Sequence, residues 1–212
     1  MIDDFDVVIL ANGKYPEYKV PLSILASAKF LVCCDGAVIK HVGKGRAPDA
    51  IVGDLDSLPN DLQLSFSGKL YHDPDQNTND LTKAIKFCQT NGFRRIAIIG
   101  STGLREDHTL GNISLMIYYA QLGLDVTIIT DTGVFIPVLA SRSFASFNGQ
   151  QISLFSFNSE TTITTEGLKY PITGQKFSMW WQGTLNEALG DNFRIDFSPG
   201  PLAVYFLFQD CR

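Results

Sequence analysis

Residues 95–121, RIAIIGSTGLREDHTLGNISLMIYYAQ, predict a strand, a glycine-rich turn and a helix in direct succession. The run before Gly100 is short and apolar, which is typical of a strand covered on both faces. From Asp107 to Gln121 the apolar residues recur at helical spacing. A strand that passes through a tight turn into a helix is the repeating unit of a parallel α/β sheet.

The same alternation continues over residues 6–130. Strands are predicted at 6–11, 30–34, 50–52, 69–71, 95–99 and 124–130, and helices at 21–28, 37–42, 78–90 and 107–121. Strands that alternate with helices imply a mostly parallel sheet, because each crossover returns the chain to the same end of the sheet. We therefore expect an N-terminal α/β domain, a Rossmann-like sheet with helices on both faces.

The pattern changes after about Gly133, where short strands recur with turn signals between them and no helix is predicted. Candidate strands lie at 134–139, 143–147, 151–155, 161–165, 176–180, 193–197 and 203–208. The pair Asn148-Gly149 is a hairpin signal between two of them. These features predict a C-terminal antiparallel β-sandwich. We expect two domains, residues 1–135 and 136–212.

The composition narrows the class of protein. The chain has 212 residues, 45% hydrophobic and 18% charged, with a formal net charge of -5. A negative charge without a basic block argues against a nucleic-acid partner. No apolar run reaches the roughly 20 residues that span a bilayer, and the acidic start Met1 to Asp6 does not resemble a signal peptide. The cysteines (Cys33, Cys34, Cys88 and Cys211) have no CxxC spacing, as expected of reduced thiols in a cytoplasmic protein.

Three acidic clusters follow strand-like runs in the first half of the chain. They are 53–57 with Asp54 and Asp56, 73–80 with Asp73, Asp75 and Asp80, and 105–108 with Glu106 and Asp107. Open α/β sheets bind ligands at the carboxyl ends of their strands, so these carboxylates are expected to converge. Converging negative charges need a cation, and Mg²⁺ shared with substrate phosphates suits oxygen ligands. The sequence therefore predicts a nucleotide-dependent enzyme without a P-loop.

Each acidic candidate also has a purely structural interpretation. In an extended segment Asp54 and Asp56 share one face and can reach one metal, but the same residues suit a loop before a helix. Asp80, in a first helical turn, is either a metal ligand or hydroxyl base, or a charge that stabilises the helix dipole. Asn77 and Asn79 either cap that helix or contact a polar ligand.

The turn before the last helix offers an anion site. Backbone amides of residues 100–103 and the helix N-terminus attract phosphate, and Arg105 is suited to clamp its oxygens. Asp107 alone is also consistent with a helix cap, and His108 with a simple polar contact. Asp35, at the end of a strand, either contacts a ribose or adenine edge or caps a helix.

Six segments, taken in order, resemble the thiamine pyrophosphokinase family over nearly the whole chain. They are CDGAV (34–38), PDAIVGDLDSL (48–58), DQNTNDLTKAI (75–85), GSTGLREDHTLGNI (100–113), TTEGLKYPI (164–172) and GTLNEA (183–188). The resemblance implies a nucleotide-binding α/β domain, a β-sandwich domain and a homodimer, with thiamine in a cleft shared by both domains and both subunits. It implies transfer of a pyrophosphoryl group from ATP to the thiamine hydroxyl, with release of AMP.

The resemblance also implies roles for individual residues. Asp54, Asp56 and Asp80 would hold Mg²⁺, Arg105 would hold phosphate oxygens, and Asp107 or Asp80 would orient or deprotonate the attacking hydroxyl. Asp35, Asp75, Asn77, Ser101 and Gly103 are further candidates for ligand binding. Tyr170 and Asn186 are expected to contact thiamine, from the other subunit.

Four positions depart from the family's pattern. Leu104 replaces the second glycine of Gly-Gly-Arg, Asn79 replaces a common threonine, Tyr170 a frequent tryptophan, and Leu185 a serine. One alternative is therefore a diphosphokinase for a different alcohol, such as a hydroxymethylpterin. Another is a nucleotide- or thiamine-binding protein without catalysis, which the many carboxylates facing a polyanion disfavour.

Overall fold

The computed structural model describes residues 4–209. The chain divides into two compact units, Met1–Asp131 and Thr132–Arg212. The predictions made for Cys211 and for residues 1–3 fall outside the described range. None of the helices within that range is long and apolar enough to cross a membrane.

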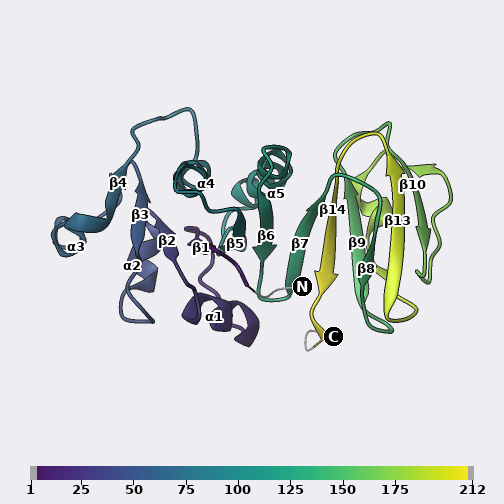
Figure 1. The fold of residues 1–212 in the computed structure, drawn as a ribbon, viewed down its shortest axis with the longest axis horizontal. Helices are drawn as coiled ribbons and strands as arrows, with labels where there is room; N and C mark the ends of the chain where they lie inside the picture. Colours follow the sequence, from purple (N-terminus) through teal and green to yellow (C-terminus); the bar gives the residue numbers. More distant parts are fainter. Residues whose placement is uncertain (1–3, 210–212) are drawn as a thin grey trace. The chain divides into compact units, whose positions relative to one another are not determined.

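The first unit alternates strands with helices (Figure 1). Its strands are β1 (Val7–Leu10), β2 (Leu31–Cys34), β3 (Ala50–Gly53), β4 (Leu70–His72), β5 (Arg95–Ile99) and β6 (Asp125–Ile129). Its helices are α1 (Lys19–Ala26), α2 (Ala37–His41), α3 (Asn60–Ser65), α4 (Asp80–Thr90) and α5 (Glu106–Gln121), with a 3₁₀ turn, η1, at Ser67–Lys69. The elements predicted for this half are present. The sequence does not predict α3 and η1, because none of their residues is buried and no apolar pattern marks them.

The six strands pair in parallel in the order β4-β3-β2-β1-β5-β6. The chain runs outward from β1 to β4 and then returns to the other side of β1 to form β5. Because crossovers between parallel strands are right-handed, this reversal puts α1 and α2 on one face and α4 and α5 on the other (Figure 1). The predicted α/β sheet is confirmed, and its topological switch point lies between β1 and β5.

Burial explains why the strand runs are apolar rather than alternating. Every residue of β1, β2 and β3 is buried, because helices cover both faces of the sheet. Helix α4 buries Leu81, Ala84, Ile85 and Cys88, the face that helical spacing predicts. Polar residues that follow each strand are thereby left together at one edge of the sheet.

The second unit consists of two antiparallel sheets, one ordered β12-β9-β14-β7 and the other β11-β10-β13-β8. The bounds are β7 (Gly133–Val138), β8 (Arg142–Ala145), β9 (Gln151–Ser156), β10 (Thr162–Glu166), β11 (Gln175–Lys176), β12 (Asn186–Glu187), β13 (Asn192–Ser198) and β14 (Leu202–Leu207), with a 3₁₀ helix, η2, at Trp180–Gly183. Phe206 of the first sheet packs against Phe144 and Phe193 of the second, with ring centroids 5.5 and 5.8 Å apart. This aromatic core joins the two sheets of the predicted antiparallel domain.

Two local predictions in this unit are wrong. The turn at Asn148-Gly149 is present, with Gly149 at φ +80° and a 2.9 Å hydrogen bond from the Gln150 amide to the Phe147 carbonyl. It joins β8 to β9, but β8 pairs with β13 while β9 pairs with β14 and β12, so the turn connects the two sheets and makes no hairpin. The strand predicted at 176–180 is reduced to β11, because the chain turns into η2 at Trp180.

Candidate active site

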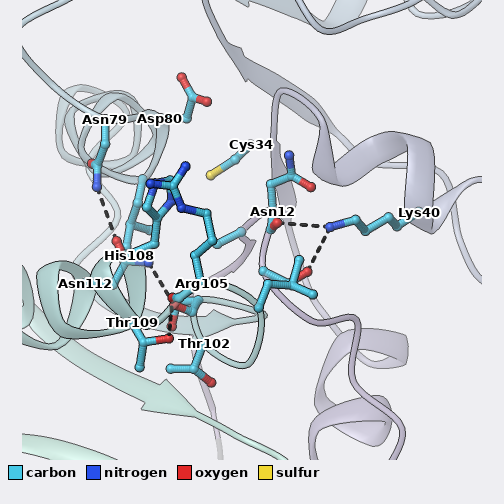
Figure 2. A pocket seen from close by; sticks show the side chains of 15 residues that line it. Asn12, Cys34, Lys40, Asn79, Asp80, Thr102, Arg105, His108, Thr109 and Asn112 are labelled. Carbon is cyan, nitrogen blue, oxygen red and sulfur yellow. Dashed lines mark hydrogen bonds between the residues drawn. The ribbon is translucent and has the colours of Figure 1, made fainter.

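A pocket of about 380 Å³ lies at the carboxyl ends of β1, β2 and β5 (Figure 2). Two of these strands flank the switch point, the position at which open α/β sheets bind ligands. The first turns of α4 and α5 complete its walls. Predicted site residues that line it are Asp80, Ser101 and Arg105, and other polar lining residues are Asn12, Lys40, Asn79, His108 and Asn112.

Two glycines in close contact form the wall between β1 and β5. The Gly13 amide donates a 2.6 Å hydrogen bond to the Gly100 carbonyl, and a Cβ on Gly13 would collide with that oxygen. Gly100 has φ +69°, a left-handed backbone that favours glycine. Ser101 is 3% exposed, lines the pocket, and its Oγ has no hydrogen-bond partner among the described residues. The turn therefore offers a hydroxyl group beside a helix N-terminus, a combination suited to an anionic ligand.

Lys83 lies between two of the predicted metal-binding carboxylates. Its Nζ is 3.2 Å from Asp80 Oδ1 and 3.4 Å from Asp54 Oδ2, and its side chain is only 2% exposed. Burial by itself lowers the pKa of Lys83, but the hydrogen bonds and charges of Asp80 and Asp54 outweigh burial and raise the pKa. No sequence pattern singled out this residue, although its i, i+3 spacing from Asp80 is a weak signal of a helical ion pair.

Asp35 is fully buried close to Asp54 and Asp80. Its Oδ2 accepts a 3.3 Å hydrogen bond from the Ser57 amide, whereas its Oδ1 has no partner among residues 4–209. Burial raises the pKa of Asp35, and the charges of Asp80 and Asp54 raise it further. Gly53 permits the close approach, because a Cβ there would lie 2.6 Å from Asp35 Cβ and 3.4 Å from Asp80 Oδ1.

These oxygen donors fit a magnesium ion that arrives with a nucleotide. Within the described part of the chain, no group of three or more His, Cys, Asp or Glu side chains is arranged to hold a metal by itself. Asp54 and Asp80 offer two carboxylates, and the unpartnered Asp35 Oδ1 is buried close to them. Mg²⁺ commonly binds through one or two carboxylates and takes its other ligands from phosphates and water.

The expectation that Asp54 and Asp56 share one face of an extended segment is wrong, because the Asp54-Leu55-Asp56 segment is not extended. Leu55 has φ +63°, a left-handed conformation that is costly for a leucine. The chain therefore turns at once after β3, and Asp54 Oδ1 accepts a 3.3 Å hydrogen bond from the Asp56 amide. The Asp56 side chain is exposed and does not line the pocket.

Asp75 and Asn77 belong to a separate loop outside the pocket. Asp75 accepts a 2.9 Å hydrogen bond from the Asn77 amide and lies 3.3 Å from Lys86 Nζ. The hydrogen bond from Asn77 is the main reason that the pKa of Asp75 is lowered. These contacts define the loop that precedes α4, and they leave a ligand role for both residues as a prediction.

Arg105 and Asp107 form an exposed ion pair at the start of α5. Arg105 Nε and Nη2 donate to the two Asp107 carboxylate oxygens at 3.0 and 2.5 Å. The hydrogen bond from Arg105 is the main cause that lowers the pKa of Asp107 to about 2. Asp107 is not the helix cap that the sequence allowed, because the N-cap position is Arg105. Its carboxylate instead holds the guanidinium at the mouth of the pocket.

Lys40 and His108 also line the pocket, and neither was predicted from the sequence as a site residue. Lys40 Nζ donates to the carbonyls of Asn12 and Gly13 at 3.0 and 2.9 Å, as Figure 2 shows. Burial lowers the pKa of Lys40. His108 lies on the first turn of α5 and points into the pocket near Arg105 (Figure 2). Both side chains therefore line the same pocket as Arg105 and Ser101.

Family models match almost the whole chain in order. The model described as "Thiamin pyrophosphokinase, catalytic domain" matches residues 22–128, and "Thiamin pyrophosphokinase, substrate-binding domain" matches residues 133–205. The chain belongs to the thiamin pyrophosphokinase family. This membership confirms the resemblance drawn from the sequence and favours pyrophosphoryl transfer over the pterin and binding-only alternatives.

Thiamin pyrophosphokinases of other organisms are similar to this chain at modest sequence identity. Thiamin pyrophosphokinase 1 of Caenorhabditis elegans is 27% identical over 157 residues, which are 68% of this chain and 64% of that protein. Thiamine pyrophosphokinase 1 of Oryza sativa subsp. japonica is 25% identical over 201 residues, 81% of this chain and 75% of that one. The crystal structure of thiamine pyrophosphokinase from Bacillus subtilis has a TM-score of 0.81 at 19% identity, covering 96% and 99% of the two chains. At that identity the structural likeness establishes the fold.

The predicted thiamine contacts lie in the region matched by the family's substrate-binding domain. Asn186 is 6% exposed. Its Oδ1 accepts from the Tyr170 amide at 3.1 Å and from the Glu187 amide at 2.9 Å, and its Nδ2 donates to the Tyr170 carbonyl at 2.7 Å. The Tyr170 ring is left exposed. Leu185 is exposed and has φ +61°. Asn186 thus holds the backbone of Tyr170, and the ring remains available to a ligand.

Proposed function

We propose that the chain transfers a pyrophosphoryl group from ATP to the hydroxyl of thiamine, giving thiamine diphosphate and AMP. The observation that carries this proposal is the ordered match of both units to the thiamin pyrophosphokinase domains. The chemistry of the pocket supports it. An anion-binding turn, an arginine and converging carboxylates lie at a single switch point, and phosphoryl transfer relies on such positioning and charge stabilisation.

The ATP phosphates would lie against the turn at 100–103, with Ser101 and Gly103 at their side and Arg105 across their oxygens. Asp54 and Asp80 would hold Mg²⁺ directly and Asp56 through water, with Asp35 as a further oxygen donor. Mg²⁺ bound in this way would neutralise phosphate charge. Asp75 and Asn77 would order the loop before α4 and contact the ligand from its edge.

The attacking hydroxyl needs orientation more than a strong base, because little proton transfer is required early in phosphoryl transfer. A carboxylate with a pKa of about 2 is a weak base near neutral pH. We therefore assign Asp107 to holding Arg105 in place. Asp80, which lines the pocket, is assigned to orienting the thiamine hydroxyl.

We propose that thiamine stacks on Tyr170 and that the enzyme is a homodimer in which Tyr170 comes from the second subunit. Large apolar side chains are exposed in the same part of the chain: Trp181 is 72%, Leu185 71% and Met179 62% exposed. Such side chains mark interaction surfaces when they gather on one unit. In this proposal residues 1–135 bind nucleotide, and 136–212 bind thiamine and form the dimer.

We also propose a cytoplasmic location. Cys33, Cys34 and Cys88 are free and buried, and burial raises the pKa of Cys33 and of Cys88 to about 12. Protonated, buried thiols are unreactive packing residues. A chain whose described cysteines form no disulfide is typical of a reducing compartment.

The test is to incubate the purified protein with ATP, Mg²⁺ and thiamine and to separate the products chromatographically. Equal amounts of AMP and thiamine diphosphate, abolished by EDTA, would support both the substrate and attack at the β-phosphorus. ADP with thiamine monophosphate would mean that attack is at the γ-phosphorus. A protein that binds Mg-ATP without turnover would favour a different alcohol, and a competition of thiamine with a hydroxymethylpterin would identify it.

A further inference from the structure

A chain of side-chain amides crosses the pocket from α4 to the turn after β5. Asn79 caps α4, its Oδ1 accepting a 2.9 Å hydrogen bond from the Thr82 amide. Asn79 Nδ2 donates to Asn112 Oδ1 at 3.2 Å, the contact drawn between them in Figure 2. Asn112 Nδ2 in turn donates to the Ser101 carbonyl at 2.8 Å. The helix that begins with Asp80 is thus connected to the turn expected to hold phosphate.

The two ends of this chain fix the orientation of both amides. At one end the Thr82 backbone offers only a donor, so Asn79 must present its oxygen there and its nitrogen to Asn112. At the other end the Ser101 carbonyl can only accept a hydrogen bond, so Asn112 must present its nitrogen there. Reversal of either amide would set donor against donor or acceptor against acceptor. Asn112 is 9% exposed, so such a mismatch would lack water to relieve it.

Asn79 is one of the positions at which the chain departs from the family's pattern. A threonine hydroxyl can cap a helix as an asparagine can. It is shorter, however, and it has one hydrogen where the asparagine amide has two. Threonine would therefore preserve the cap of α4 while losing the hydrogen bond to Asn112. The substitution Asn79→Thr thus tests the connection without removing the cap.

We propose that Asn79 and Asn112 are positioning residues that set the separation between Asp80 and the turn at 100–103. The inference rests on the proposed function, because that reaction requires a carboxylate at the N-terminus of α4 to act on a group held by the turn. Asn112 is buried and Asn79 is exposed at the end of α4; the pair acts on Asp80 through the backbone of α4 and on the phosphate site through Ser101.

The first variant is Asn79→Thr, assayed for kcat and for KM with ATP and with thiamine. We expect kcat to fall about tenfold, because displacements near 1 Å at a reacting centre have effects of one to two orders of magnitude. The two KM values should change less than about twofold, and AMP affinity measured by calorimetry without Mg²⁺ should change equally little, because every lining residue of the pocket except Asn79 is retained. Asn91→Thr is the matched control: Asn91 is the C-cap of the same helix, far along it from the pocket.

A double-mutant cycle separates positioning from general damage. Asn112→Ala and Asn79→Thr break the same connection, so the double variant should have nearly the kcat of Asn112→Ala alone. The inference is overturned if the fold-loss of kcat in the double variant equals the product of the losses in the two single variants. Wild-type kcat in Asn79→Thr overturns it as well. A wild type that binds Mg-ATP but transfers nothing to thiamine would overturn the proposed function and this inference with it. An active wild type together with an equally active Asn79→Thr overturns the inference alone.

Discussion

Two clusters of oppositely charged side chains lie beside the pocket, and they differ in how deeply they are buried. Around Lys83, the cation is 2% exposed and is paired with two carboxylates, of which Asp80 lines the pocket. At the start of α5, Arg105 and Asp107 are 69% and 62% exposed and form an ion pair with each other. The first group is fixed by the sheet and α4, whereas the second is held by one helical turn in contact with solvent.

The difference indicates which group is prepared in advance and which rearranges. A buried ammonium cannot leave its carboxylates without a large penalty, so Asp54 and Asp80 keep their separation with or without a ligand. An exposed ion pair contributes little to stability, so Arg105 can exchange a carboxylate for phosphate oxygens at small cost. We therefore expect the Lys83 group to define the geometry of the site and Arg105 to respond to the nucleotide.

The largest effect is expected on turnover when a carboxylate of the fixed group loses its charge. Asp80→Asn or Asp54→Asn should each lower kcat by about 10³-fold, the scale of losing a preorganised electrostatic group, while the far-ultraviolet circular dichroism stays unchanged. Asp61→Asn, an exposed carboxylate in the first turn of α3, is the control. Near-normal turnover in both site variants would contradict the metal assignment.

The second effect is on stability when the buried cation is removed. Lys83→Met should lower the free energy of unfolding by about 2–3 kcal/mol, somewhat below the 3–5 kcal/mol typical of fully buried pairs, because the two carboxylates are partly exposed. Urea unfolding measures it. Lys86→Met, three residues along the same helix at a lysine that is 50% exposed, should change stability by less than about 0.5 kcal/mol. Equal losses of unfolding free energy in the two variants would contradict the expectation that the buried Lys83 stabilises the fold more than an exposed lysine does.

A smaller effect is expected from a change in the exposed group. Arg105→Lys keeps the positive charge but removes the planar fork that binds two oxygens at once. We expect kcat/KM for ATP to fall about tenfold, since one bidentate contact is lost, and the unfolding midpoint to remain within 1–2 °C. A drop in thermal stability without any kinetic change would show that Arg105 is structural.

The smallest expected effect is a difference in titration between two carboxyls. Pairing with Arg105 lowers the pKa of Asp107 to about 2. The pairing therefore contributes to folding stability above the ordinary carboxyl pKa, and this contribution is lost as the pH falls through about 2. The pKa of Asp35 is raised by burial, so ionisation of Asp35 costs stability as pH rises through its folded pKa. Carboxyl NMR titrations should place the two midpoints on opposite sides of 3.8, and Arg105→Ala should move only that of Asp107 upward.

The sequence predicted those features that depend on local pattern. Short apolar runs before glycine or aspartate identified the parallel strands, and residue type and position made Asn79 one of the candidates for the α4 cap, which the structure assigns to it. Contacts between distant segments were beyond such reasoning. Lys83 is an ordinary helix lysine until β3 brings Asp54 to it, and the Asn148-Gly149 turn has the same local chemistry whether it joins one sheet or two. The left-handed Leu55 has no sequence signal, because leucine normally avoids that conformation.

The switch point between β1 and β5 has a consequence for folding. Val7 aligns with Ile96 in the sheet, so two of the three strands that end at the pocket, β1 and β5, are far apart along the chain. That pairing closes a long loop, and such closures are slow compared with local helix formation. The pocket proposed to bind nucleotide is therefore complete only after most of this unit has folded. A fluorescent nucleotide added during refolding would report the completion of the sheet, and nucleotide that binds only the native state would stabilise it by an amount that grows with the logarithm of the nucleotide concentration.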